Sequence, residues 1–216
     1  MRWRSIPEPI SRLPPFESRM HTFSPILEQL ADIYRLMDAA YQETAQAYGF
    51  VCNGCEDNCC RSRFYHHTIV EHLFLQAGLD RLTIERCREV TRRSRDIHRQ
   101  GMPAGSLCPL NEAGRCLLYD FRPMICRLHG IPHRLLLPDG RVHDGPGCAS
   151  CERLPQPEAE RRLDRTPFYQ AVAELEQEAR RLAGWTGKRR MTIAEMVLSR
   201  PGRPTGAPRE DNGVAP

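Results

Sequence analysis

The chain has 216 residues, of which 40% are hydrophobic and 27% charged, and its formal net charge is +4. This balance is ordinary for a globular protein with a core of its own. No apolar run approaches the ~20 residues that cross a bilayer, and the proline-interrupted N-terminus lacks the apolar stretch of a secretory signal. We therefore expect a cytoplasmic protein without a membrane partner.

Helical patterns dominate the middle of the chain. Residues 1–23 are predicted to form an extended arm because they contain four prolines and no periodicity, and residues 200–216 a disordered tail. A first helix is predicted to begin at the Ser24-Pro25 cap and to end at Gly49. Apolar residues at spacings of three and four, with caps at several ends, predict further helices over 66–77, 81–100, 166–184 and 192–199.

The segment 102–160 is rich in proline and glycine, and one short hairpin is predicted within it. Its strands are Arg134–Leu137 and Arg141–His143, on either side of the turn Pro138-Asp139-Gly140. Such a long irregular segment needs some other restraint inside a compact domain. The expected fold is mainly α: a small helical domain over 24–199 with a cysteine-rich, metal-binding loop region and one β-hairpin.

Ten cysteines in a reducing compartment favour metal ligation or catalytic thiols over disulfides. The first block is Cys52-x2-Cys55-x3-Cys59-Cys60. A CxxC turn lets two sulfurs converge on one ion, whereas a thioredoxin-like motif would stand in a βαβ unit that this helical context lacks. Adjacent side chains diverge, so the pair Cys59-Cys60 favours two neighbouring sites or a multinuclear centre.

Further cysteines lie in the proline- and glycine-rich segment, where a role as small buried hydrophobes is disfavoured. Cys87 differs, because it lies on the apolar stripe of the helix predicted over 81–100, and we expect it to belong to the core. The candidate ligands in the second half of the chain are Cys108, Cys116, Cys126, Cys148 and Cys151.

Together the cysteine blocks resemble a known family. The first block, then Cys108-Pro109-Leu110, then Cys116-Leu117-Leu118-Tyr119-x2-Arg122-Pro123-x2-Cys126-Arg127, resemble the YkgJ-type cysteine-cluster family. Its members are described as zinc- or iron-chelating domains with eight shared cysteines. The resemblance covers about residues 50–151. It implies as ligands Cys52, Cys55, Cys59, Cys60, Cys108, Cys116 and Cys126, with the eighth supplied by Cys148 or Cys151.

Nearby residues receive supporting roles. Arg122 and Arg127 are predicted to donate N–H groups to sulfur or to offset the charge of a tetrathiolate, although an ordinary surface ion pair is an equal alternative for Arg122. Histidines are less favoured as ligands because the sulfurs suffice. The histidines nearby in sequence are His66, His67, His129, His133 and His143.

Thiolate-rich sites suit zinc and iron–sulfur clusters alike, so the ligand type leaves the metal open. Three classes of function follow. The first is a metal-binding protein. The second is an iron–sulfur enzyme related to protein lysine methylation, because the family's cysteine block also occurs in a flagellin lysine methylase. The third, a zinc-stabilised nucleic-acid-binding module, is disfavoured because the arginines are scattered and aromatics make up only 7%.

Overall fold

The computed structural model describes residues 16–52, 59–101, 103, 105–155, 157 and 161–199. About 53% of the described residues are helical, in seven α-helices beside a few short strands, which confirms the expected mainly-α class. None of the described helices is long and apolar enough to cross a membrane. The predicted tail 200–216 and most of the predicted arm lie outside the described residues.

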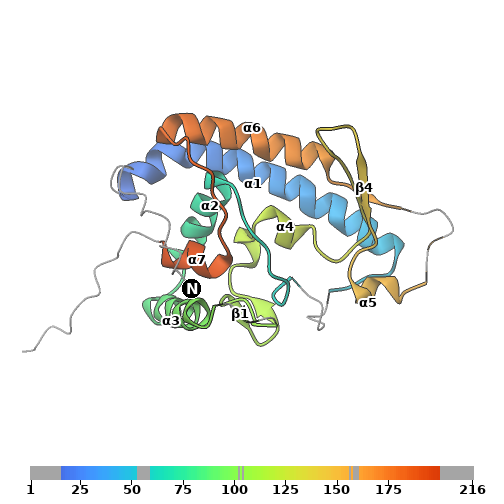
Figure 1. The fold of residues 1–216 in the computed structure, drawn as a ribbon, viewed down its shortest axis with the longest axis horizontal. Helices are drawn as coiled ribbons and strands as arrows, with labels where there is room; N and C mark the ends of the chain where they lie inside the picture. The colour runs from blue at the N-terminus through green and yellow to red at the C-terminus, as the bar shows by residue number, and fades with distance from the viewer. Residues whose placement is uncertain are drawn as a thin grey trace, which may run out of the picture.

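Two long helices form the frame of the molecule. Helix α1 (Phe16–Ala47) and helix α6 (Thr166–Ala183) lie side by side and run in opposite directions (Figure 1). Buried side chains recur at helical spacing on α1, among them Leu30, Tyr34 and Met37, and they face the core that α6 completes with Leu175 and others. Burying these two apolar stripes against each other stabilises both helices far more than their intrinsic propensity does.

Helix α1 begins earlier than predicted, so the extended arm is wrong over residues 16–23. Phe23 is buried and continues the apolar stripe one turn before the proposed cap. The Ser24 hydroxyl bonds to the Glu28 carboxylate in place of capping the helix, and Pro25 lies inside it. Tertiary burial of Phe23 therefore outweighs the cap signal.

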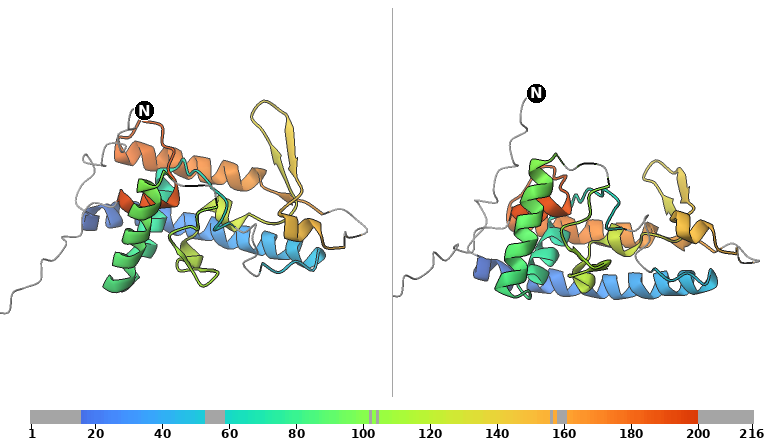
Figure 2. Two further views of the ribbon diagram at one scale, coloured as in Figure 1. Left: turned by 60° about the horizontal axis from the view of Figure 1, so that its bottom comes forward. Right: turned by 90° about the horizontal axis from the view of Figure 1, so that it is seen from below.

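Helices α2 (Ile69–Leu79), α3 (Ile84–Arg99) and α7 (Ile193–Leu198) form a second group below this frame. Figure 2 shows α3 lying across the direction of α1. Both α2 and α3 begin a turn later than predicted, because Thr68 and Thr83 are their side-chain caps. A smaller apolar cluster, which includes Leu79, Val90 and Met196, joins the three helices.

The predicted hairpin is confirmed. Strand β3 (His133–Leu136) pairs antiparallel with β4 (Val142–Gly145). No sequence pattern predicted β5 (Leu163–Asp164), which pairs parallel with β3, or the two-residue hairpin β1 (Asn111–Glu112) and β2 (Arg115–Cys116). The expected irregular region also contains three short helical turns: η1 (Tyr119–Phe121), α4 (Met124–Arg127) and α5 (Ala149–Glu152).

Gly78 does not end α2 as expected, because the helix continues to Leu79; instead it permits a close contact. A Cβ atom on Gly78 would lie 2.5 Å from Cγ and 2.7 Å from Cβ of Phe121, which is tighter than van der Waals contact. Phe121 also packs on Phe74, with ring centroids 5.1 Å apart. The glycine therefore lets η1, and the residues that follow it, approach α2.

Replacing Gly78 by alanine is expected to lower the free energy of unfolding by about 1–3 kcal/mol, because overpacking outweighs the ~1 kcal/mol gain in helix propensity. Urea denaturation measures this change. The neighbouring substitution Ala77→Gly reports the propensity effect alone. A more stable Gly78→Ala protein would contradict the prediction.

Candidate metal centre

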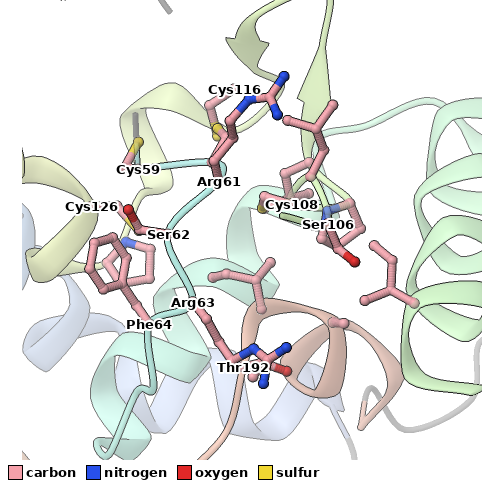
Figure 3. Close-up of a pocket in the computed structure, with 18 of the residues that line it drawn as sticks. Cys59, Arg61, Ser62, Arg63, Phe64, Ser106, Cys108, Cys116, Cys126 and Thr192 are labelled. Carbon is pink, nitrogen blue, oxygen red and sulfur yellow. The ribbon is translucent and has the colours of Figure 1, made fainter. Parts of the chain in front are cut away.

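Five cysteines line one cavity of about 480 Å³. They come from separate parts of the chain: the turn after the first helix, the loop before β1, strand β2 and helix α4. Figure 3 shows Cys59, Cys116 and Cys126 at one side of this cavity, with Thr192 at the opposite end. We call these five residues the cavity cysteines: Cys59, Cys60, Cys108, Cys116 and Cys126.

Backbone hydrogen bonds hold the cysteine-bearing segments together. The N–H of Cys108 donates to the carbonyl of Cys60 at 2.7 Å, which joins two segments far apart in the sequence. The N–H of Leu117 donates to the carbonyl of Leu110 at 2.8 Å and closes the hairpin that carries Cys116. The cysteines are therefore brought together by the fold of the chain itself.

The buried carboxylate of Glu71 positions the helix that carries Cys126. Its Oε1 accepts a hydrogen bond from the N–H of Met124 at 2.7 Å and another from the hydroxyl of Tyr34 at 3.2 Å. Its Oε2 accepts from the Thr68 hydroxyl at 2.6 Å. Because Glu71 lies on α2, one side chain links α1, α2 and the start of α4.

Cys60 is the electrostatic centre of the group. Hydrogen bonds from the Cys108 and Cys59 thiols lower its pKa well below the usual range, and the same bonds raise the pKa of Cys59 and Cys108. Burial raises the pKa of Cys116, to about 11, and that of Cys126. The cavity by itself thus favours one thiolate, since each further negative charge meets the first in a poorly solvated space.

Cys59 and Cys60 do not diverge, contrary to the expectation from their adjacency. Both line the same cavity, and the two thiols are hydrogen-bonded to each other. The turn that residues 59 and 60 occupy directs both sulfurs to one side, a conformation that an extended chain would not adopt.

Two other groups favour negative charge on the sulfurs. Arg122 lines the cavity, and its charge lowers the pKa values of Cys59, Cys60 and Cys126. Its guanidinium stacks on the Tyr119 ring, 3.5 Å from the centroid. The Asn111 side chain is hydrogen-bonded to Cys60 and also lowers the pKa of that thiol.

Arg127 has a structural role in addition to the predicted one, because its charge also lowers the pKa of Cys116. Its guanidinium donates to the Asp38 carboxylate at 2.5 Å and to the backbone carbonyls of Arg122 and Asp120. The side chain is buried and lies over the Tyr34 ring. Arg127 therefore fastens α4 to α1 and shapes the loop before it, and it is not among the residues that line the cavity.

Comparison of the chain with models of known protein families, with curated proteins and with solved structures found no match. Its function must be argued from its own geometry. Among the described residues, no three His, Cys, Asp or Glu side chains already converge as a metal site would require.

The remaining candidate ligands lie apart from the cavity. Cys148 and Cys151 are buried in the core at α5, which Figure 1 shows at the far side of the molecule from α3. Cys148 and the exposed Cys52 both raise the pKa of Tyr41, so these two thiols lie near the C-terminal half of α1. Cys55 lies outside the described residues.

Cys87 is half-buried on α3 and does not line the cavity, so it is neither the fully buried core residue expected nor a cavity cysteine. Of the histidines considered, only His66 lines the cavity. His67 bonds instead to the carbonyl of Arg189, and His133 stacks on His143 in the hairpin.

Sequence reasoning did not find Glu71 or Asn111. Glu71 lies in the first turn of α2, where an acidic residue normally stabilises the helix by interacting with its dipole. Asn111 stands in a turn-rich stretch, where asparagine is expected for local reasons. No local pattern distinguishes either residue, because its role depends on contacts with distant segments.

Proposed function

We propose that the protein binds zinc or iron through the cavity cysteines, in a thiolate-ligated centre. The observation that carries this proposal is that five cysteines from separate segments line one cavity, with the Cys60 sulfur in contact with two other thiols. Thiolates are the ligands that both zinc and iron–sulfur clusters select. The thiols must stay reduced, which fits the cytoplasm as the proposed compartment.

The protonation of the cavity thiols favours a bound metal cation over a cavity without metal. Packing Cys59, Cys60 and Cys108 together keeps protons on Cys59 and Cys108, because their hydrogen bonds to Cys60 and their burial raise the pKa values of these two thiols. A divalent metal would displace these protons and neutralise the resulting thiolates. The Asn111 side chain, which is hydrogen-bonded to Cys60, would then donate to a metal-bound sulfur, as groups around thiolate sites do.

Five thiols exceed the four of a closed zinc site, so the cavity suits either one zinc with a spare thiol or an iron–sulfur cluster. The resemblance to the cysteine-cluster family is consistent with both. Cys148 and Cys151, which are buried in the core, are proposed as packing residues of α5 and not as ligands of this centre.

The proposal is tested by measuring zinc, iron and acid-labile sulfide in protein purified without oxygen. The wild type is expected to hold at least one metal equivalent, and both Cys60→Ser and Cys108→Ser to lose it. Visible absorption accompanied by sulfide identifies a cluster, whereas a colourless protein with stoichiometric zinc identifies a zinc site.

Cys87→Ser is the matched control, because Cys87 is a cysteine of similar exposure outside the cavity. It should keep the full metal content. Metal that survives the loss of Cys60 and of Cys108, or a wild type that binds neither zinc nor iron, would rule out the proposed centre.

A further inference from the structure

The cavity extends well beyond the sulfurs. At about 480 Å³ it falls in the range of small-molecule sites, which span ~300–1,000 Å³, whereas a metal ion with its ligands needs only a fraction of that space. Figure 3 shows the cysteines at one side, with the chain from Cys59 to Phe64 leading to the far end at Thr192. Room for an organic molecule therefore remains beside the proposed centre.

Apolar side chains form much of the remaining wall. Phe64, Ile97, Leu107 and Ile193 line the cavity, and they come from four different segments. Leu107 is 45% exposed, so part of its apolar surface faces solvent. Such a surface gains stability when an apolar body covers it.

The charged groups of the wall are all of one sign. Arg61, Arg63 and Arg122 line the cavity, and none of the described residues that line it carries a carboxylate. Arg122 lies beside the thiols and lowers their pKa values, and Figure 3 places Arg61 next to Cys116. Arg63 lies at the other end, beside Thr192, so neutralising the thiolates does not explain it.

We propose that the cavity binds a small organic carboxylate with an apolar body. Arg63 holds the carboxylate, the body covers Phe64, Leu107 and Ile193, and the opposite end of the ligand lies next to the cavity cysteines. Guanidinium matches a carboxylate with two parallel N–H donors, which makes arginine the residue suited to this contact. The last of these placements rests on the proposed function, since it sets the ligand beside the metal centre.

Backbone hydrogen bonds hold the segment around Arg63 in a fixed position. The backbone of His66 pairs with that of Met191 through hydrogen bonds of 2.7 and 2.9 Å, which fixes the segment that carries Arg63 and Phe64 against the start of α7. The capping box of Thr192 and Glu195 in turn fixes α7 itself. The arginine thus projects from a braced segment at the rim of the cavity.

The test uses octanoate as the probe and measures its binding to the full chain by titration calorimetry. Octanoate should bind saturably, and octan-1-ol and acetate much more weakly, because each lacks one half of the proposed recognition. Arg63→Met should weaken octanoate binding by about tenfold or more, as loss of a charge-assisted contact does. Arg88→Met, a matched change at an exposed arginine of α3 that does not line the cavity, should leave it unchanged, and Arg61→Met should weaken it less than Arg63→Met does.

Absence of octanoate binding, or binding that survives Arg63→Met, would overturn the inference, and a loss on Arg61→Met alone would overturn the orientation. Metal content and the thermal midpoint are measured on the same samples, which excludes misfolding of a variant. Protein that keeps its metal but does not bind octanoate would refute only this inference. Protein that binds octanoate through Arg63 yet holds no metal would refute only the proposed function.

Discussion

Removing the metal with a chelator is expected to loosen the segment 105–126 while the pair of helices α1 and α6 stays folded. This segment contains three of the cavity cysteines, and its regular structure is limited to two-residue strands and single helical turns. Binding free energy in a thiolate site acts as folding free energy for the chain that supplies the ligands. Helices α1 and α6 bury their apolar stripes against each other, so their folding does not depend on the free energy of metal binding.

Hydrogen exchange followed by mass spectrometry measures this effect. Amides in 105–126 should lose protection by about tenfold or more on metal removal, while those of α1 and α6 change little. Chelator added to Cys108→Ser protein, which is expected to lack the metal, serves as the control and should produce no further change. Uniform loss of protection through the whole chain would contradict a local role for the metal.

Replacing Glu71 by alanine is expected to lower the free energy of unfolding by about 3 kcal/mol and to weaken metal retention. The substitution leaves the N–H of Met124 and the hydroxyl of Tyr34 buried without their acceptor, and each such orphaned group costs about 1–3 kcal/mol. The start of α4 is then no longer fixed, so Cys126 loses its position in the cavity.

Urea denaturation and metal analysis of the same variant measure both effects. Glu71→Gln keeps one acceptor oxygen and should lie between the wild type and Glu71→Ala in both. The exposed Glu28→Ala on α1 controls for loss of an ordinary surface carboxylate, with an expected change within about 0.5 kcal/mol. A stable Glu71→Ala protein with its full metal content would show that Cys126 is positioned by other contacts.

Much of the fold could be predicted from local signals. The helices around Leu30 and Leu175 follow from periodicity, and the hairpin at Pro138-Asp139-Gly140 from turn chemistry. The predicted helix boundaries that were wrong differ from the structure because of tertiary contacts. Phe23 extended α1 because the core covers it, and Gly78 lies within α2, packed against Phe121, where a glycine had been expected to end the helix.

The candidate site was predictable as a set of cysteines but not as an arrangement. Spacing could suggest that Cys60 and Cys108 share a centre, yet only the backbone bond between their segments brings them together. Cys148 and Cys151 have a spacing suited to ligation, and α5, which begins at the Cys148 cap, places both in the core. Arg127 lies next to Cys126 in sequence, although its guanidinium faces α1.

The backbone pairing of His66 with Met191 joins an early part of the chain to a part that is synthesised much later. All the cavity cysteines leave the ribosome before Glu176, whose carboxylate caps α2, and before Thr192 and its neighbours, which complete the cavity wall. The growing chain therefore contains all of its cavity thiols before the last part of the cavity wall is synthesised, and domains fold as their parts emerge. Metal supplied at that stage reaches the thiols before the wall at Thr192 and Ile193 is present, whereas metal supplied to the finished protein meets the complete cavity.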